Sequence, residues 1–137
     1  MMTIDEMQDV LDELAEELPE AFYRELNGGI VLLPEAKESE YTQRPGDLYT
    51  LGEYHRGGGL GNYIKIYYGS FEHVFGTLPD EAMKNELRKT LRHEFRHHLE
   101  HLAGEDGLEI EDEIYIRKYL ESRGAIKGRR KKPIPKL

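Results

Sequence analysis

The residues best suited to chemistry in this chain lie in the run His93-Glu94-Phe95-Arg96-His97, which has the pattern HExxH. Side chains four positions apart share one face of a helix, so His93 and His97 can bind one metal ion from successive turns. Glu94 projects beside them and can act as a general base toward a metal-bound water. The spacing therefore predicts hydrolysis by a zinc-activated water, with Zn²⁺ as the cofactor.

The element that must position these residues is a long amphipathic helix, which we expect over residues 77–103. Thr77 and Asp80 have the spacing of a helix cap, and Pro79 falls in the first turn. Gly104 marks the expected end of the helix.

The predicted helix divides into stripes, because successive residues turn by about 100°. The apolar face contains Leu87, Leu91, Phe95, Leu99 and Leu102. The face expected to contact water contains Lys89, Arg92, Arg96 and Glu100. His93 and His97 lie on the flank between these faces, and Glu94 lies between that flank and the apolar face. The predicted ligands and base thus border the core, where the floor of a cleft would lie.

A catalytic zinc takes three protein ligands, so one more ligand is expected from the next element. We expect a final helix over residues 108–122 that packs antiparallel against the HExxH helix. Asp112 lies in the middle of its apolar arc at about the height of His97, and a carboxylate there is costly to bury without a partner. Asp112 is the predicted third ligand and Glu109 the second choice. Asp106 is too near the turn, about 13 Å from His97 by helical rise.

The rest of the chain predicts short helices and a small sheet. One stripe of apolar residues at helical spacing and a Thr3–Glu6 capping box indicate a helix over residues 3–18. Pro19 begins a second, shorter helix. Alternating or continuous apolar runs indicate strands at residues 30–33, 47–56 and 62–68, with a polar loop at 34–46 and a helical turn at 70–75. The glycine-rich segment 57–61 is read as a hairpin connection or, alternatively, as a mobile flap beside a substrate cleft.

Composition limits the remaining possibilities. The chain has 137 residues and no cysteine, which predicts one domain over residues 1–122 and excludes disulfides, thiolate zinc sites and cysteine nucleophiles. The first ten residues are acidic and lack the apolar run of a secretory signal, and no apolar run approaches the length of a membrane span. We therefore expect a cytoplasmic protein with no membrane partner. The tail 123–137, which we expect to be flexible, carries seven basic residues, and the remaining 12 basic against 27 acidic residues give −15. Because that acidic body repels nucleic acid, we expect no nucleic-acid partner.

Three stretches resemble the small bacterial zincin-like metallopeptidases, also called minimal zincins. They are residues 67–71 (YYGSF), residues 93–104 (HEFRHHLEHLAG), and Leu108 with Glu111-Asp112. The resemblance implies an α+β fold in which a small three-stranded sheet packs against the HExxH helix. It also implies a zinc site formed by His93 and His97, with Glu94 as the general base.

The sequence departs from that family's pattern at two positions. Many zincins have a third ligand six residues after the second histidine, and this chain has Ala103 there. Asp112 therefore depends on the argument from helix faces. Arg96 stands where peptidase versions of the motif usually have an uncharged residue.

Function is consequently left with alternatives. The first hypothesis is a zinc metallopeptidase acting on a peptide or protein, with Tyr67, Tyr68 or His55 as candidates to stabilise the oxyanion. The second is a catalytically silent metal-binding module that recognises a protein partner. In less favoured hypotheses, the basic run 129–132 binds an anionic surface or the tail acts as an autoinhibitor. We expect His98 to be a hydrogen-bonded core residue. For His101 we expect no functional role, and the alternative is that it supports the metal site or binds metal adventitiously. For His55 and His73 we expect structural roles.

Overall fold

Helix α1 (Ile4–Glu16) begins at the predicted capping box. Thr3 Oγ1 accepts a hydrogen bond from the Glu6 backbone N–H at 3.1 Å, and Glu6 Oε1 accepts one from the Thr3 N–H at 2.8 Å. The computed structural model describes residues 1–44, 46 and 48–105. Within them, α1 is followed by the 3₁₀ helix η1 (Glu20–Tyr23), which starts after Pro19 as expected.

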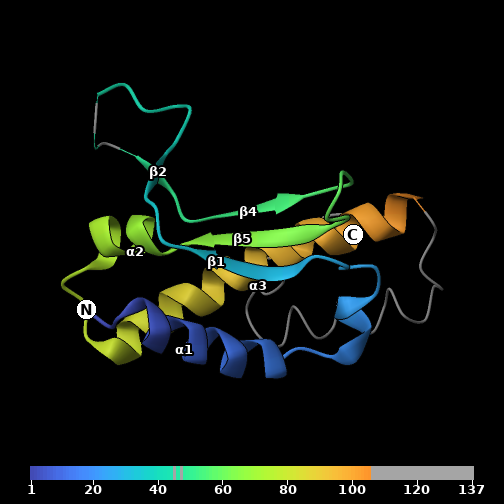
Figure 1. Cartoon of the computed structure of the whole chain (residues 1–137), viewed down its shortest axis with the longest axis horizontal. Helices are drawn as coiled ribbons and strands as arrows, with labels where there is room; N and C mark the ends of the chain where they lie inside the picture. Colours follow the sequence, from blue (N-terminus) through green and yellow to red (C-terminus); the bar gives the residue numbers. More distant parts are fainter. Residues whose placement is uncertain (45, 47, 106–137) are drawn as a thin grey trace, which may run out of the picture.

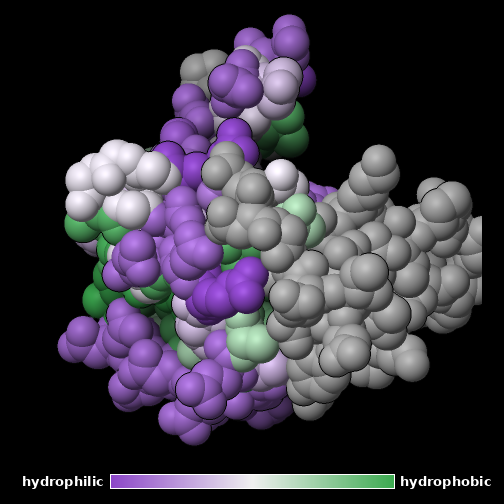
Figure 2. Space-filling model, turned by 90° about the vertical axis from the view of Figure 1, so that its right-hand side faces the viewer, coloured by the Kyte–Doolittle hydropathy of each residue, from purple (hydrophilic) through white to green (hydrophobic). Residues whose placement is uncertain are grey.

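The strands form one small sheet and one short ribbon. Strand β1 (Gly29–Leu33) pairs in parallel with β5 (Tyr63–Tyr67), and β4 (Gly52–His55) pairs antiparallel with the other side of β5. The order β1-β5-β4 leaves β4 at an edge of this three-stranded sheet. Strands β2 (Lys37–Glu38) and β3 (Tyr49–Thr50) form the ribbon. The described part of the segment between them projects from the body (Figure 1), and Figure 2 shows mainly hydrophilic residues on this projection.

Helices α2 (Tyr68–Phe75) and α3 (Asp80–Glu105) complete the described chain. Gly69 is required at the start of α2, because a Cβ there would lie 2.5 Å from the Ala36 backbone nitrogen. The neighbouring Ser70 Oγ accepts a hydrogen bond of 2.9 Å from the Lys37 N–H. These two buried residues therefore hold the segment leading into β2 against the body.

The core lies between the sheet and helices α1 and α3, which cover the same face of the sheet (Figure 1). Strand β5 contributes Ile64 and Ile66, which are both fully buried. All five residues of the predicted apolar face of α3 are at most 1% exposed. The α+β class, the small three-stranded sheet and the apolar face of the HExxH helix are thus confirmed.

Several local predictions were wrong. Helix α3 begins at Asp80 and continues through Gly104 to Glu105, because an exposed glycine in the last turn does not by itself end a helix. The continuous apolar run at residues 30–33 suggested a buried strand, but β1 is only half-buried. Strand β2 lies within the predicted polar loop. Arg92 is 8% exposed, since it faces α1 and its Nη2 lies 3.4 Å from Glu17 Oε1. The expected helix over 108–122 and the tail lie outside the described residues. None of the described helices is long and apolar enough to span a membrane.

Candidate functional site

The two histidines of the HExxH run converge on the exposed flank of α3. Their Nε2 atoms are 3.2 Å apart and their rings are nearly perpendicular, with centroids 4.7 Å apart. Two nitrogens that each lie about 2.0–2.1 Å from a tetrahedral zinc ion would be about 3.3 Å apart. His93 and His97 therefore have the separation that two imidazole ligands of one metal ion require.

The charge state of His93 also suits a metal ligand. Partial burial lowers the pKa of the His93 ring, and the neighbouring His97 and Arg96 lower it further. A lowered pKa favours the neutral imidazole, which is the form that binds metal. The residue nevertheless stays exposed at the surface, so an ion in solution can reach it.

Glu94 is buried beside this pair and has no polar partner among the described residues. The residue is only 6% exposed. Within the described part of the chain, no hydrogen bond or ion pair to its carboxyl group is found. Burial raises its pKa to about 7, helped by the negative charge of Glu53. A carboxyl with such a pKa can both accept and release a proton near neutral pH.

A groove runs between the edge strand β4 and helix α3, with Glu94 at its middle. One part, of about 570 Å³, is lined by residues 53–56 and by Glu94, His97, Glu100 and His101 of α3. The adjoining part, of about 490 Å³, is lined by residues 49–52 and by Glu86, Lys89, Thr90, His93 and Glu94. The strand comes close to the helix at Gly52, where a Cβ would lie 3.0 Å from Thr90 Cγ2.

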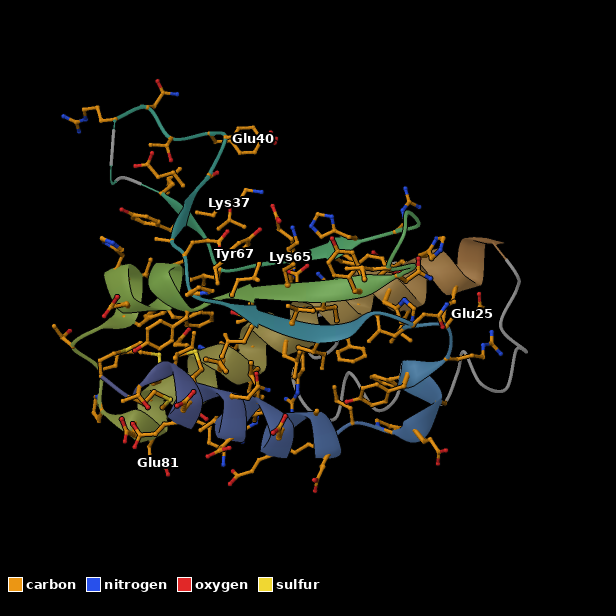
Figure 3. All side chains as sticks on the ribbon, viewed as in Figure 1. Glu25, Lys37, Glu40, Lys65, Tyr67 and Glu81 are labelled. Atoms are coloured by element: carbon orange, nitrogen blue, oxygen red, sulfur yellow. The ribbon has the colours of Figure 1, made fainter. Side chains whose placement is uncertain are left out.

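Glu53 on β4 anchors a polar cluster next to the groove. Burial alone would raise its pKa, but hydrogen bonds from Lys37, from the Tyr67 hydroxyl at 2.7 Å and from His55 Nε2 at 3.1 Å outweigh burial and hold the pKa at about 2. Lys37 and Tyr67 lie together at one end of the sheet (Figure 3). Glu53 is therefore a stable anion that ties β2 and β5 to the edge strand.

Tyr54, the next residue of β4, points to the opposite face and joins the edge strand to α3. Its hydroxyl donates to His98 Nδ1 at 2.6 Å, and His98 Nε2 lies 2.8 Å from the Arg24 carbonyl oxygen. A carbonyl only accepts, so Nε2 carries the proton and Nδ1 is the acceptor. His98 is fully buried, as expected for a hydrogen-bonded core histidine.

The structure separates the candidates for oxyanion stabilisation. The Tyr68 hydroxyl donates to the Met2 carbonyl at 2.6 Å and does not line the groove. Tyr67 is 3% exposed and its hydroxyl donates to Glu53. Only His55 of these candidates lines the groove, where its ring stacks on Tyr63 at 4.9 Å. His73 stacks on Tyr49 at 4.8 Å, in keeping with a structural role.

The third metal ligand is not decided by the described part of the chain. Asp112, Glu109 and Asp106 all lie outside it, and within it no group of three or more histidine or acidic side chains is arranged to hold a metal ion. The prediction that Glu100 lies on the face in contact with water was wrong, and no role in the site was predicted for this residue. Glu100 lines the groove, and its Oε1 lies 3.4 Å from His97 Nδ1. The spacing of three residues between them was the available signal.

Comparison with known proteins shows the family of this chain and says nothing about its activity. No protein-family model matches the sequence, and no curated protein matches it significantly. Among solved structures, a conserved hypothetical protein from Thermo thermophilus is 38% identical, with a TM-score of 0.67. The similarity covers 76% of this chain and all of that protein. At this identity and coverage, the chain belongs to the same family as that conserved hypothetical protein.

Proposed function

We propose that this protein is a zinc-dependent metallopeptidase with a zincin-like arrangement of its helix and edge strand. One observation carries the proposal: a buried carboxyl without a described polar partner, Glu94, lies next to two imidazoles whose Nε2 atoms are 3.2 Å apart. A buried carboxyl with a perturbed pKa is costly to maintain, and such groups concentrate at catalytic sites. The paired imidazoles supply the matching metal ligands.

His93 and His97 would hold the ion, with Asp112 as the proposed third ligand. A zinc ion at such a site lowers the pKa of water and polarises a carbonyl group. Glu94 then takes the proton of the attacking water and delivers it to the leaving amine. Burial raises the pKa of Glu94 to about 7 in the metal-free protein, so its carboxyl exchanges a proton near neutral pH before a cation binds beside it.

The edge strand gives the expected substrate a place to bind. Within the described residues only β5 pairs with β4, so the other edge of Gly52–His55 is free to pair with an extended peptide. A peptide on this edge would run along the groove past Glu94. We therefore propose a peptide or an extended protein segment as the substrate. His55, which lines the groove, is the proposed group for stabilising the oxyanion.

The decisive experiment combines metal analysis with peptide cleavage. Untagged wild-type protein should contain zinc, and the His97→Ala variant should lose it. The Glu94→Gln variant should keep the zinc and cleave no member of a broad peptide library, because it retains the ligands and lacks the base. Full activity of Glu94→Gln would refute the mechanism.

One observation favours the second candidate, a metal-binding module without catalytic activity. Arg96 places a positive charge near His93, which opposes the binding of a cation. Wild-type protein that contains zinc and cleaves nothing in the library would support this candidate. Activity gained by Arg96→Gln in the same assay would show that the arginine suppresses catalysis.

A further inference from the structure

We infer that Glu100 is a positioning residue that holds the His97 imidazole with its proton on Nδ1, so that the Nε2 lone pair faces the metal position. This inference rests on the proposed function and assigns to Glu100 the orientation of one ligand. It does not make Glu100 a ligand or a catalytic group.

The contact follows from the helix and from the groove. Glu100 lies three residues after His97, so both side chains project from neighbouring turns of the same face of α3. Its Oε1 lies 3.4 Å from His97 Nδ1, on the side of the ring opposite the Nε2 that approaches His93 at 3.2 Å. The contact is an ion-pair contact and does not have hydrogen-bond geometry, so Glu100 acts on the His97 ring through its negative charge.

The proton position follows from what a carboxylate can do. An ionised carboxylate attracts the positive end of an N–H group and repels a nitrogen lone pair, so it favours the tautomer with the hydrogen on the His97 nitrogen that faces Glu100. A neutral imidazole has one N–H, and Nε2 is then left with its lone pair. That lone pair points to the position where His93 Nε2 converges, which is where a metal ion would bind.

Within the described part of the chain, the contacts of the His97 ring nitrogens are His93 Nε2 at 3.2 Å and Glu100 Oε1 at 3.4 Å. His93 has no such support, because its only described ring-nitrogen contact is His97. The two ligands are therefore unequal, with His97 oriented in advance and His93 free to adjust. Carboxylates that orient metal-binding histidines typically contribute about ten- to a hundredfold to metal affinity.

The first test measures the tautomer of His97 without metal. In wild-type protein with a chelator present, ¹⁵N NMR of the imidazole should show Nδ1 protonated and Nε2 bare. Glu100→Ala should abolish this preference, and Glu100→Gln should keep part of it because an amide oxygen still attracts an N–H group. Glu86→Ala is the matched control: it removes the same charge from the same helix beside the groove, where Glu86 pairs with Lys89.

The second test measures zinc affinity by competition with a chromophoric chelator. Glu100→Ala should bind zinc about ten- to a hundredfold more weakly than wild type. Glu86→Ala should stay within about threefold, which separates orientation of His97 from a general loss of negative charge. Equal losses in both variants, or a wild-type His97 protonated on Nε2, would overturn the inference and leave the proposed function standing. Wild-type protein that binds no zinc would overturn both.

Discussion

Replacing Glu94 with glutamine should remove a loss of stability that the metal-free wild-type protein shows as pH rises. The Glu94 carboxyl is 6% exposed, lacks a described polar partner and has its pKa raised from 4.5 to about 7 by burial and by Glu53. Because the folded pKa is the higher one, the native state binds more protons than the unfolded state between these two values. The free energy of unfolding of the wild type therefore falls as pH rises through this window.

The size of the effect follows from the same two values. A pKa raised from 4.5 to about 7 removes about 2.5 kcal/mol of stability between pH 5 and pH 8.5, at about 1.4 kcal/mol per pH unit. Glutamine has nearly the same shape and does not ionise. Any cost of burying its amide is the same at both pH values, so the difference between them isolates the ionisation of Glu94.

The assay is urea unfolding in the presence of a chelator, followed by circular dichroism at both pH values. Relative to wild type, Glu94→Gln should gain about 2.5 kcal/mol from pH 5 to pH 8.5. Glu40→Gln is the control, since Glu40 is exposed on the projection away from the sheet (Figure 3). Parallel pH profiles for wild type and Glu94→Gln would show that the carboxyl is not buried and unpaired, and the case for a poised base would fail.

Three further substitutions test the scaffold around the groove. Phe95→Ala should lower the free energy of unfolding by about 3–5 kcal/mol, because Phe95 is fully buried and its ring lies 5.1 Å from that of Tyr23. A loss below about 1 kcal/mol in urea unfolding would contradict the described core. Tyr54→Phe should cost about 1–3 kcal/mol, because His98 Nδ1 is left as a buried acceptor without a donor; a neutral result would show that no such bond exists. Glu53 has its pKa lowered to about 2 and is 23% exposed, so Glu53→Gln should cost about 1–2 kcal/mol at pH 7 after solvent screening. That loss should shrink as pH falls below 4.5, since the stability contributed by an acid with a lowered pKa disappears toward its folded pKa; a loss that is constant with pH would exclude the ionic contribution.

Patterns of short range predicted most of the fold. Three predictions depend on spacings within a few residues, and each agrees with the structure: the Thr3–Glu6 capping box, the break between two helices at Pro19, and the apolar face of α3. Helix ends were predicted less well. Gly104 continues α3, and Thr77 lies before its start, because a terminal residue changes the helix free energy by only about 1 kcal/mol.

The candidate site divides in the same way between sequence and tertiary structure. The HExxH spacing alone determined that His93 and His97 share a flank and that Glu94 borders the core, because helical geometry fixes these directions locally. Contacts between distant segments decided the rest. Strand β4 approaches α3 closely at Gly52, and the groove lies between them. The Glu17 carboxylate, directly after α1, pairs with Arg92 and accounts for its burial. Neither contact has a local signal, because each depends on how the chain brings elements far apart in sequence into register.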